Sequence, residues 1–382
     1  MRVSTLAAAF AVTLLAGVGT FGCGDELPPP QTPPPPPPAA PPPPPPVPEP
    51  PPPAPPKKTL AELQMAAGQT MNEAFAAGDA KKLAALYAEN AVMKIAGAPD
   101  VTGRANIEKN LSEFFASFGK MKTGASRVFA KNDVLVSEWT MNATHSGEFM
   151  GIKATEKPVG WVGASVMWFA DDGTIKEEHI YWNAAVVAPQ VGASKEKNRG
   201  IPALPAQPLM VAPGAAADEE ANVAAVQSLN RAIDGKDEKG LTALFGDDVT
   251  WDDITLPEAT KGKPAVQKYF KGLSVAFPDA KSATQHSWGV GNWVVEEGTY
   301  AGTNNGPLFG AKATKKAMTV HELTVYELDK SHKILHAVNY GNDLEMSSQL
   351  AAPAAKPAAK PAPTVKPAAP AAKPAAKPAP KK

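Results

Sequence analysis

The chain has 382 residues, and its 38 basic and 38 acidic residues give it a formal net charge of zero. Without a net positive charge the chain has no general affinity for nucleic acid, and we expect no nucleic-acid partner. The single cysteine, Cys23, excludes an internal disulfide and any metal site built from several thiolates.

Residues 1–22 have the pattern of a secretory signal peptide, whose apolar run, Leu6–Val18, is too short to span a membrane. Cys23 directly follows glycine and resembles the acylated cysteine of bacterial lipoproteins, although Thr20 stands where that family usually has leucine. The resemblance implies an exported protein whose lipidated Cys23 anchors it to the bacterial envelope. Gly24 then favours the outer membrane, on its periplasmic side or at the surface. The alternative is ordinary cleavage nearby and a soluble periplasmic product.

Residues 23–58 combine this cysteine with a stretch, Pro28–Pro56, that is almost entirely proline. Such a stretch lacks amide donors and apolar side chains, so it cannot form a core and we expect it to be disordered. A polyproline helix rises about 3.1 Å per residue, which predicts a stiff spacer of roughly 90 Å. Recognition by a proline-binding partner is the alternative.

Residues 59–192 are predicted to form a first domain. Apolar residues recur at helical spacing over Leu60–Phe75, Gly78 ends this pattern, and Asp79 is a typical N-cap for a second helix that reaches Tyr87. The pair Asp172-Gly173 predicts a tight hairpin between the last two strands. The other predicted elements are a strand at 91–95, a helix at 105–118, and strands at 125–130, 134–144, 160–170 and 174–184.

A linker at residues 193–217, which carries four prolines, separates this domain from residues 218–350. The second block repeats the order of elements. Gly235 is expected to stop its first helix, and Pro264 suits the first turn of its third helix. The predicted helices are 223–233, 239–245 and 264–277, and the predicted strands are 249–254, 282–289, 292–300, 316–328 and 333–341.

Residues 351–382 repeat Ala-Ala-Lys-Pro and contain seven lysines but no acidic residue. We expect this tail to be disordered, because it has no apolar pattern that could form a core. On an exported protein, a basic arm predicts an anionic envelope polymer or lipid surface as its partner. An inert, solvated tail is the alternative.

Both blocks place three helices before a run of strands, a pattern that predicts the α+β class. We expect two tandem cone-shaped domains, each with three helices packed on a strongly bent antiparallel sheet, flanked by the disordered proline-rich and Ala/Lys/Pro-rich segments. The closing stretches align at a constant offset, which indicates an internal duplication. The aligned pairs are Ile175 with Ile334, Asn183 with Asn342, and Gln190 with Gln349.

Short stretches of both blocks carry a resemblance to a known family: Phe277-Pro278-Asp279, Gly298-Thr299-Tyr300 and Gly306-Pro307-Leu308-Phe309 in the second block, and residues 144–149 and 175–183 in the first. They resemble the SnoaL-like branch of the nuclear transport factor 2-like superfamily, which contains polyketide cyclases and ketosteroid isomerase-like proteins. The resemblance implies a cone around an apolar pocket. In such enzymes a desolvated carboxylate in the pocket moves protons beside a carbonyl group.

The family's base is an aspartate that ends a Tyr-Trp-Asp stretch on the last strand, and the matching positions here are Asn183 and Asn342. An amide cannot usefully accept a proton at neutral pH, and loss of a positioned base costs about 10²- to 10⁴-fold in rate. We therefore expect a noncatalytic, envelope-anchored protein that binds a small apolar ligand or a protein partner. The alternative is an isomerase-, cyclase- or hydrolase-like enzyme that acts on a small carbonyl compound through His145 or Asp253.

The candidate ligand-binding residues lie mostly on the predicted strands. Alternate residues of a strand share a face, so Tyr181 and His179 should point where Asn183 points. Trp161 is alternatively a core residue. The full set is Asn183, Tyr181, His145, Trp161, Asn342, Tyr340 and Tyr300.

Two further expectations concern partners and cofactors. The sequence has no glycine-rich phosphate-binding loop and no histidine pair with metal-ligand spacing on a shared face, so we expect no cofactor and no bound metal. Open sheet faces in this superfamily commonly pair. The duplication therefore predicts either an intrachain pseudo-dimer or a homodimer.

Overall fold

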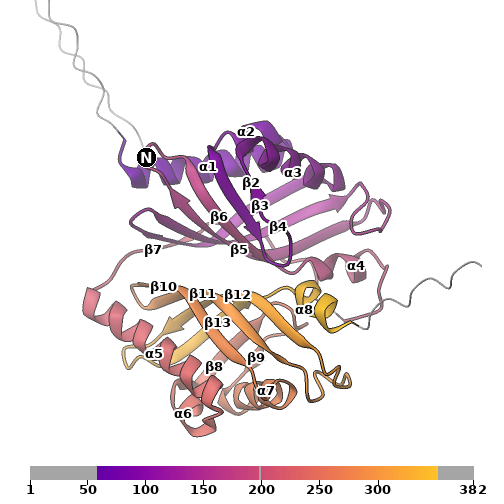
Figure 1. Ribbon diagram of the computed structural model, residues 1–382. Coiled ribbons are helices and arrows are strands. Elements are labelled where there is room, and N and C mark those ends of the chain that lie inside the picture. Colours follow the sequence, from indigo (N-terminus) through magenta and orange to yellow (C-terminus); the bar gives the residue numbers. More distant parts are fainter. Residues whose placement is uncertain (1–57, 198, 352–382) are drawn as a thin grey trace, which may run out of the picture. The chain divides into compact units, whose positions relative to one another are not determined.

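The computed structural model describes residues 58–197 and 199–351. The predictions of a signal peptide, of lipidation at Cys23, of the proline-rich spacer and of the basic tail lie outside these residues. Within the described part of the chain, no helix is long and apolar enough to cross a membrane. Two domains of the same design follow one another, here called the first domain (residues 59–192) and the second domain (residues 216–350) (Figure 1).

In the first domain, three helices cover one face of a sheet (Figure 1). Thr59 and Glu62 form a reciprocal capping box at the start of the first helix, and Gly78 ends this helix in the left-handed conformation. Asp79 then caps the second helix, as the sequence predicts. The elements are α1 (Leu60–Ala77), α2 (Ala80–Ala84), β1 (Tyr87–Ile95), β2 (Val101–Thr102), α3 (Arg104–Ser117), β3 (Phe118–Lys131), β4 (Val134–His145), β5 (Pro158–Phe169), β6 (Ile175–Trp182), the 3₁₀ turn η1 (Ala184–Val186) and α4 (Val187–Gln190).

The second domain repeats this order. Its first helix includes Gly235, and the residue that takes the left-handed conformation is Lys236, one position later than predicted. The elements are α5 (Ala216–Gly235), α6 (Glu238–Ala243), β8 (Phe245–Asp253), β9 (Thr260–Lys261), α7 (Lys263–Ala276), β10 (Lys281–Val290), β11 (Trp293–Thr303), β12 (Ala317–Leu328), β13 (Ile334–Tyr340) and α8 (Asp343–Leu350).

Each domain contains one sheet. The strand orders are β2-β1-β6-β5-β4-β3-β7 and β10-β11-β12-β13-β8-β9. The sheets are mixed rather than purely antiparallel as predicted, because β1 pairs with β6, and β8 with β13, in parallel. Parallel neighbours need a long connection, and in each domain the third helix and the intervening strands provide it.

The predicted linker contains one strand, β7 (Leu209–Val211), which pairs in parallel with β3 at the edge of the first sheet. The sequence gives little sign of it, because a run of three apolar residues is too short to show a period. Before this strand, Arg199 donates from Nε to the carbonyl oxygen of Leu256 (2.7 Å). The linker is therefore bonded to both domains.

The duplication is visible in equivalent contacts. In the first domain, the side-chain amide of Gln190 bonds to the backbone N–H and carbonyl of Gly160 on β5, at 2.9 and 2.8 Å. In the second, Gln349 bonds to the backbone N–H and carbonyl of Thr319 on β12, at 2.9 and 2.7 Å. Both pairs are separated by the offset that relates Asn183 to Asn342. Positions at this offset are called equivalent below.

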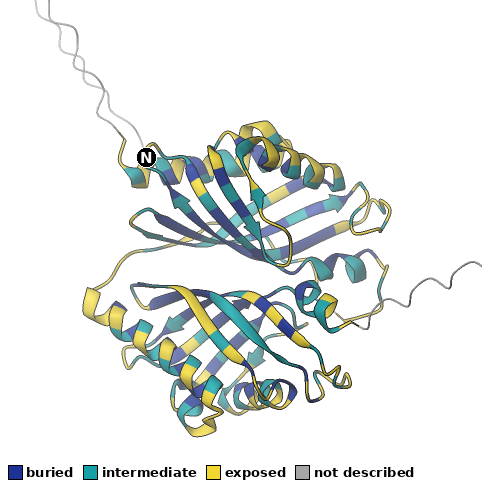
Figure 2. Cartoon of the chain, viewed as in Figure 1, coloured by how far each residue is buried: buried dark blue, intermediate teal, exposed yellow. Residues whose placement is uncertain are grey.

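Each domain buries its own core between helices and sheet, and buried residues follow the strands of both sheets (Figure 2). A further apolar cluster, in contrast, contains side chains of both domains. Its buried members are Phe129, Val134, Val136, Ala164, Val166 and Tyr181 of the first domain and Ile254, Val290, Trp293, Val295, Leu323, Val325, Val338 and Tyr340 of the second.

Candidate functional site

The interior of the first domain is packed with aromatic rings. Trp161 lies on β5 and is buried, with its ring centroid 5.1 Å from Phe118 and 4.9 Å from Trp182. Phe149 adds a fourth ring, 4.8 Å from Phe118. The structure thus places Trp161, a candidate ligand-binding residue, in a core of mutually contacting rings.

His145, a candidate catalytic residue, lies at the end of β4 in the same core and is fully buried. Its Nδ1 is 3.0 Å from Oγ1 of Thr155, and its ring lies against Phe118. Its Nε2 has no hydrogen-bond partner among the described residues. The contacts of this imidazole are thus the hydroxyl of Thr155 and the ring of Phe118, and no carboxylate of the described residues bonds to it to orient it as a base.

The second domain, by contrast, contains a partly open cavity of about 140 Å³. An apolar cavity of roughly this size holds one benzene ring. Strands β8 and β10–β13 and helices α5, α7 and α8 contribute to its walls. Its aromatic lining consists of Trp251, Tyr269, Phe270, Phe277, Tyr300, Phe309 and Tyr326.

The difference between the two interiors comes from three tryptophans. Trp139, on β4, faces Gly163 across the β4–β5 ladder, whereas the equivalent ladder in the second domain pairs Gly298 with Glu322. Two further tryptophans of the first domain are equally absent from the second. The equivalent pairs are Trp139 and Gly298, Trp161 and Val320, and Trp182 and Gly341, and all three second-domain residues line the cavity.

Four carboxyl groups also line this cavity, from Asp253, Glu296, Glu322 and Asp343. Among the described residues that form its walls, none is lysine, arginine or histidine. Nor do any His, Cys, Asp and Glu side chains of the described chain form a group of three or more that could hold a metal ion. The cavity is therefore apolar and acidic.

Asp253, the second candidate catalytic residue, ends β8 and is buried. Its Oδ1 accepts from the backbone N–H and hydroxyl of Thr255, at 2.9 and 2.7 Å, and its Oδ2 accepts from the hydroxyl of Tyr269 at 2.9 Å. Burial raises the pKa of Asp253, against these three bonds, which lower it. Both of its oxygens are held in place within the protein.

Glu322 lies on β12, and its Oε2 accepts from the amide of Asn339 at 3.0 Å. Burial, with a smaller contribution from the nearby negative charges of Asp253 and Glu345, raises the pKa of Glu322 to about 7. The amide of Asn339 opposes this rise. Glu322 is therefore the carboxyl of this cavity whose titration falls near neutral pH.

Glu296, on β11, is only 8% exposed. Its Oε1 accepts from the amide of Asn230 at 2.6 Å, while its Oε2 is buried without a partner among the described residues. Burial raises the pKa of Glu296, and also raises the pKa of Asp343 to about 6. Desolvation thus raises the pKa of all four carboxyls that line the cavity.

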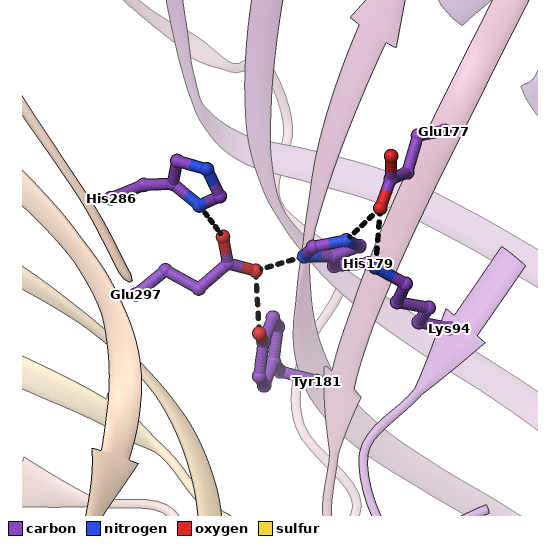
Figure 3. Close-up of polar contacts among 6 residues, drawn as sticks. All are labelled: Lys94, Glu177, His179, Tyr181, His286 and Glu297. Atoms are coloured by element: carbon purple, nitrogen blue, oxygen red, sulfur yellow. Dashed lines mark hydrogen bonds and ion pairs between the residues drawn. The ribbon is translucent and has the colours of Figure 1, made fainter. Parts of the chain in front are cut away.

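A second cluster of polar side chains lies where the two domains meet (Figure 3). Glu297, on β11, is fully buried and accepts from the hydroxyl of Tyr181 (2.5 Å) and from Nδ1 of His179, both on β6. Its other oxygen is 2.8 Å from Nδ1 of His286. Burial favours a raised pKa for Glu297, but bonds from His179, Tyr181 and His286 outweigh it and lower that pKa.

The same cluster continues into the first domain through the other nitrogen of His179. Its Nε2 is 2.8 Å from Glu177, which is in turn 2.5 Å from Nζ of Lys94. Burial alone favours a lower pKa for His179, but Glu297 and Glu177 reverse this and raise it. His179 thus lies between two carboxylates, which favour its protonated form (Figure 3).

An equivalent cluster surrounds Glu138, the first-domain counterpart of Glu297. Tyr340, the counterpart of Tyr181, donates to Glu138 at 2.7 Å. Arg127, the counterpart of His286, forms a two-pronged ion pair with Glu138 and lies over the ring of Trp293. Each domain thus buries a glutamate that accepts a hydrogen bond from the other domain's tyrosine. The basic partner of Glu138 is an arginine, whereas the basic partners of Glu297 are histidines.

The two asparagines at the family's aspartate position are both helix caps that also contact the opposite domain. Asn183 caps η1 and donates to Oδ2 of Asp343 at 2.9 Å. Asn342 caps α8 and donates to the carbonyl oxygen of Ala96 at 2.8 Å. An aspartate caps a helix equally well but has no N–H to donate, so these contacts require the amide.

The candidate residues from the sequence therefore separate into three places. Asp253, Tyr300 and Asn342 line the cavity of the second domain. His145 and Trp161 lie in the aromatic core of the first domain. Tyr181, Tyr340 and Asn183 bond across the contact between the domains.

Sequence reasoning missed Glu296 and Glu322. A signal for Glu296 exists, because Glu296 and Glu297 interrupt a strand whose preceding residues, Trp293–Val295, are all apolar. Charged residues in such a run are buried and need partners. Alternation correctly put His179 and Tyr181 on one face, but this face contacts the other domain instead of the interior of the first.

Comparison with protein families gives one match in each domain. The model described as SnoaL-like polyketide cyclase matches residues 66–191, and the model described as SnoaL-like domain matches residues 226–337. No curated protein matches the chain at a significant level.

Solved structures similar to the chain cover about a third of it. AclR from Streptomyces galilaeus is 22% identical over 36% of this chain and 85% of its own, with a TM-score of 0.33. IdmH from Streptomyces antibioticus is 23% identical over 34% and 98%, with a TM-score of 0.31. TsrD from Streptomyces laurentii is 14% identical over 35% and 97%, with a TM-score of 0.32.

The family matches fall one on each copy of the duplicated α+β domain, and together they cover, in whole or in part, every described helix except α8 and every described strand except β7. The chain therefore belongs to the SnoaL-like family of cyclases and isomerases, as two tandem domains of the nuclear transport factor 2-like superfamily.

Proposed function

We propose that the second domain binds a small, largely apolar molecule and that the first domain is its structural partner. The observation that carries this proposal is the cavity of about 140 Å³ in the second domain, where the first domain has tryptophans. Ligand sites are typically concave, mainly apolar, and supplied with a few fixed polar groups. The aromatic lining and the held carboxyl of Asp253 fit that description.

We further propose that the two domains act as an intrachain pair. In support, residues of both sheets share one apolar cluster, and two buried tyrosine–glutamate bonds, Tyr181 to Glu297 and Tyr340 to Glu138, cross between them. Each domain covers apolar surface on the sheet of the other, and apolar surface that is covered in this way does not promote aggregation. The first domain thereby stabilises the wall of strands that shapes the cavity.

The binding proposal is tested by placing a tryptophan side chain in the cavity of the second domain. Small aromatic and alicyclic molecules are screened by thermal shift on the full chain, and hits are then measured on Val320→Trp, which restores the ring present at Trp161. We expect binding to be lost in this variant and retained in Leu335→Trp, which adds the same ring at a position 40% exposed on β13. Equal binding by both variants, or no hit at all, rejects the proposal.

A second candidate function, proton transfer on a small carbonyl compound, is favoured by one observation, the pKa of Glu322 at about 7. A carboxyl with that pKa exchanges protons efficiently at neutral pH and serves as general acid or base. Isomerase and cyclase substrates are tested with the full chain across pH. This candidate requires turnover that follows a midpoint near 7 and disappears in Glu322→Gln, and turnover that survives this substitution removes Glu322 from the mechanism.

The cellular location of the protein is proposed from the sequence alone. We propose that Cys23 carries a lipid anchor and that the proline-rich spacer holds the domains away from an envelope membrane. The change Cys23→Ser should move the protein from the membrane fraction to the soluble fraction and abolish labelling with palmitate. Retention of Cys23→Ser in the membrane contradicts lipidation there.

A further inference from the structure

The four carboxyl groups of the cavity belong to the second domain alone. They come from four different elements, β8, β11, β12 and α8, so they meet only in the folded cavity. The first domain has no acidic residue at any equivalent place. Its residues there are Ile95, which occupies the register position of Asp253, and Ser137, Gly163 and Ala184, which are equivalent to Glu296, Glu322 and Asp343.

Glu296 leaves one oxygen without a partner. The side chain is more than nine-tenths buried and lines the cavity, and Oε1 accepts from Asn230. The nearby hydroxyl of Thr284 lowers the pKa of this carboxyl, but its geometry leaves Oε2 without a hydrogen bond. A buried carboxylate oxygen without a hydrogen bond destabilises the folded protein. A ligand with an N–H or O–H group at this point removes that cost.

The charge of the cavity is only partly compensated: Arg199, which is not part of the lining, lowers the pKa of Asp253. The negative charges of Asp253 and Glu296 contribute to the raised pKa of Glu322. The described walls contain no basic residue that could neutralise them. A cation in the cavity would neutralise this charge, and the lining includes aromatic residues such as Trp251 and Tyr269, whose ring faces attract cations.

From these observations we infer that the cavity takes its ligand as a protonated amine on an apolar body of about one ring, with Glu296 and Glu322 accepting its N–H groups. This inference rests on the proposed binding function. A neutral molecule of the same shape leaves the charge uncompensated. A quaternary ammonium supplies charge but has no N–H for the free oxygen of Glu296.

Benzylamine, benzyl alcohol and benzyltrimethylammonium separate these requirements, and their binding to the full chain is measured by titration calorimetry at pH 7. We expect benzylamine to bind at least tenfold more tightly than either of the other two. Binding of the amine should also release protons, because the cation favours the ionised form of Glu322. Titrations in buffers of different ionisation enthalpy measure that release.

Variants assign the effect to the two glutamates. Glu296→Gln and Glu322→Gln should each weaken benzylamine at least tenfold and leave benzyl alcohol unchanged. Glu220→Gln, at an exposed position of α5, is the matched control and should bind like the wild type. The comparison of the three ligands on the wild-type protein does not depend on whether any variant folds.

The outcomes distinguish this inference from the proposed function. If benzyl alcohol binds as tightly as benzylamine, and both are lost in Val320→Trp, the inference fails and the binding function stands. If benzyltrimethylammonium equals benzylamine, the role of the N–H donors fails. If no member of the series or of the wider screen binds, both proposals are overturned.

Discussion

The contact between the domains makes a specific prediction for Glu297→Gln. This carboxylate has no exposed surface and accepts three bonds, from Tyr181, His179 and His286. His286 is 43% exposed, so its contribution is small. The two buried bonds to a charged group contribute about 1.5–3 kcal/mol each, and glutamine keeps one acceptor oxygen, so we expect a loss of about 3 kcal/mol.

The loss should depend on pH in a defined direction. The pKa of His179 is raised above 6.5 in the folded protein, so its stabilisation is complete below 6.5 and is lost as pH rises through the raised value. The pKa of Glu297 is lowered below 4.5, so its stabilisation is present above 4.5 and is lost as pH falls through the lowered value. The difference between wild type and Glu297→Gln should therefore be largest between pH 4.5 and 6.5.

Urea denaturation of the full chain, followed by tryptophan fluorescence at pH 5.5 and pH 9, measures this difference. In thermal denaturation, where 1 kcal/mol shifts the midpoint by about 2–4 °C, the midpoint of Glu297→Gln at pH 5.5 should lie about 6–12 °C below that of the wild type. Glu138→Gln is the matched control, because its partner Arg127 remains charged throughout this range and its cost should be flat with pH. An equal cost of Glu297→Gln at both pH values, or a cost under about 1 kcal/mol at pH 5.5, refutes the reasoning.

Three further predictions concern single side chains. Glu322→Gln should be as stable as wild type below pH 4.5 and up to about 3 kcal/mol more stable above pH 7. The reason is that the raised pKa of Glu322 makes the stability of the wild type fall between these pH values, and parallel pH–stability curves of the two proteins contradict this. Trp161→Ala should cost about 3–5 kcal/mol in urea denaturation, since it opens a cavity among packed rings, and a cost under 1 kcal/mol shows that the ring is not core. Gln349→Ala should cost about 1 kcal/mol through its two bonds to Thr319, and an unchanged midpoint shows that water replaces them.

Local signals in the sequence predicted the scaffold well. The capping residue Asp79, the terminating Gly78 and the hairpin at Asp172-Gly173 act through bonds within a few residues, so they can be read without tertiary information. The parallel pairing of β1 with β6 could not be predicted in this way. Their pairing is set by how distant segments meet, and strand alternation alone does not specify a partner.

The asparagines show a different limit. The sequence correctly indicated that Asn183 and Asn342 occupy equivalent positions, and the chemistry of an amide argued against a base there. What the amides do instead depends on Asp343 and Ala96, which lie 160 and 246 residues away in the chain. No local pattern links residues at such separations.

Neighbouring residues on β11 show most clearly what the sequence by itself determined and what only the tertiary structure decided. Because alternate residues of a strand face opposite sides, the sequence determined that Glu296 and Glu297 point in opposite directions. Both follow an apolar run, and charged residues in such a run are buried together with it. Only the packing of the second sheet, with its own helices on one face and the first domain on the other, directs Glu296 into the cavity and Glu297 to Tyr181 and His179. The local period fixes the alternation of faces, whereas the long-range contacts of each face fix what the side chain meets.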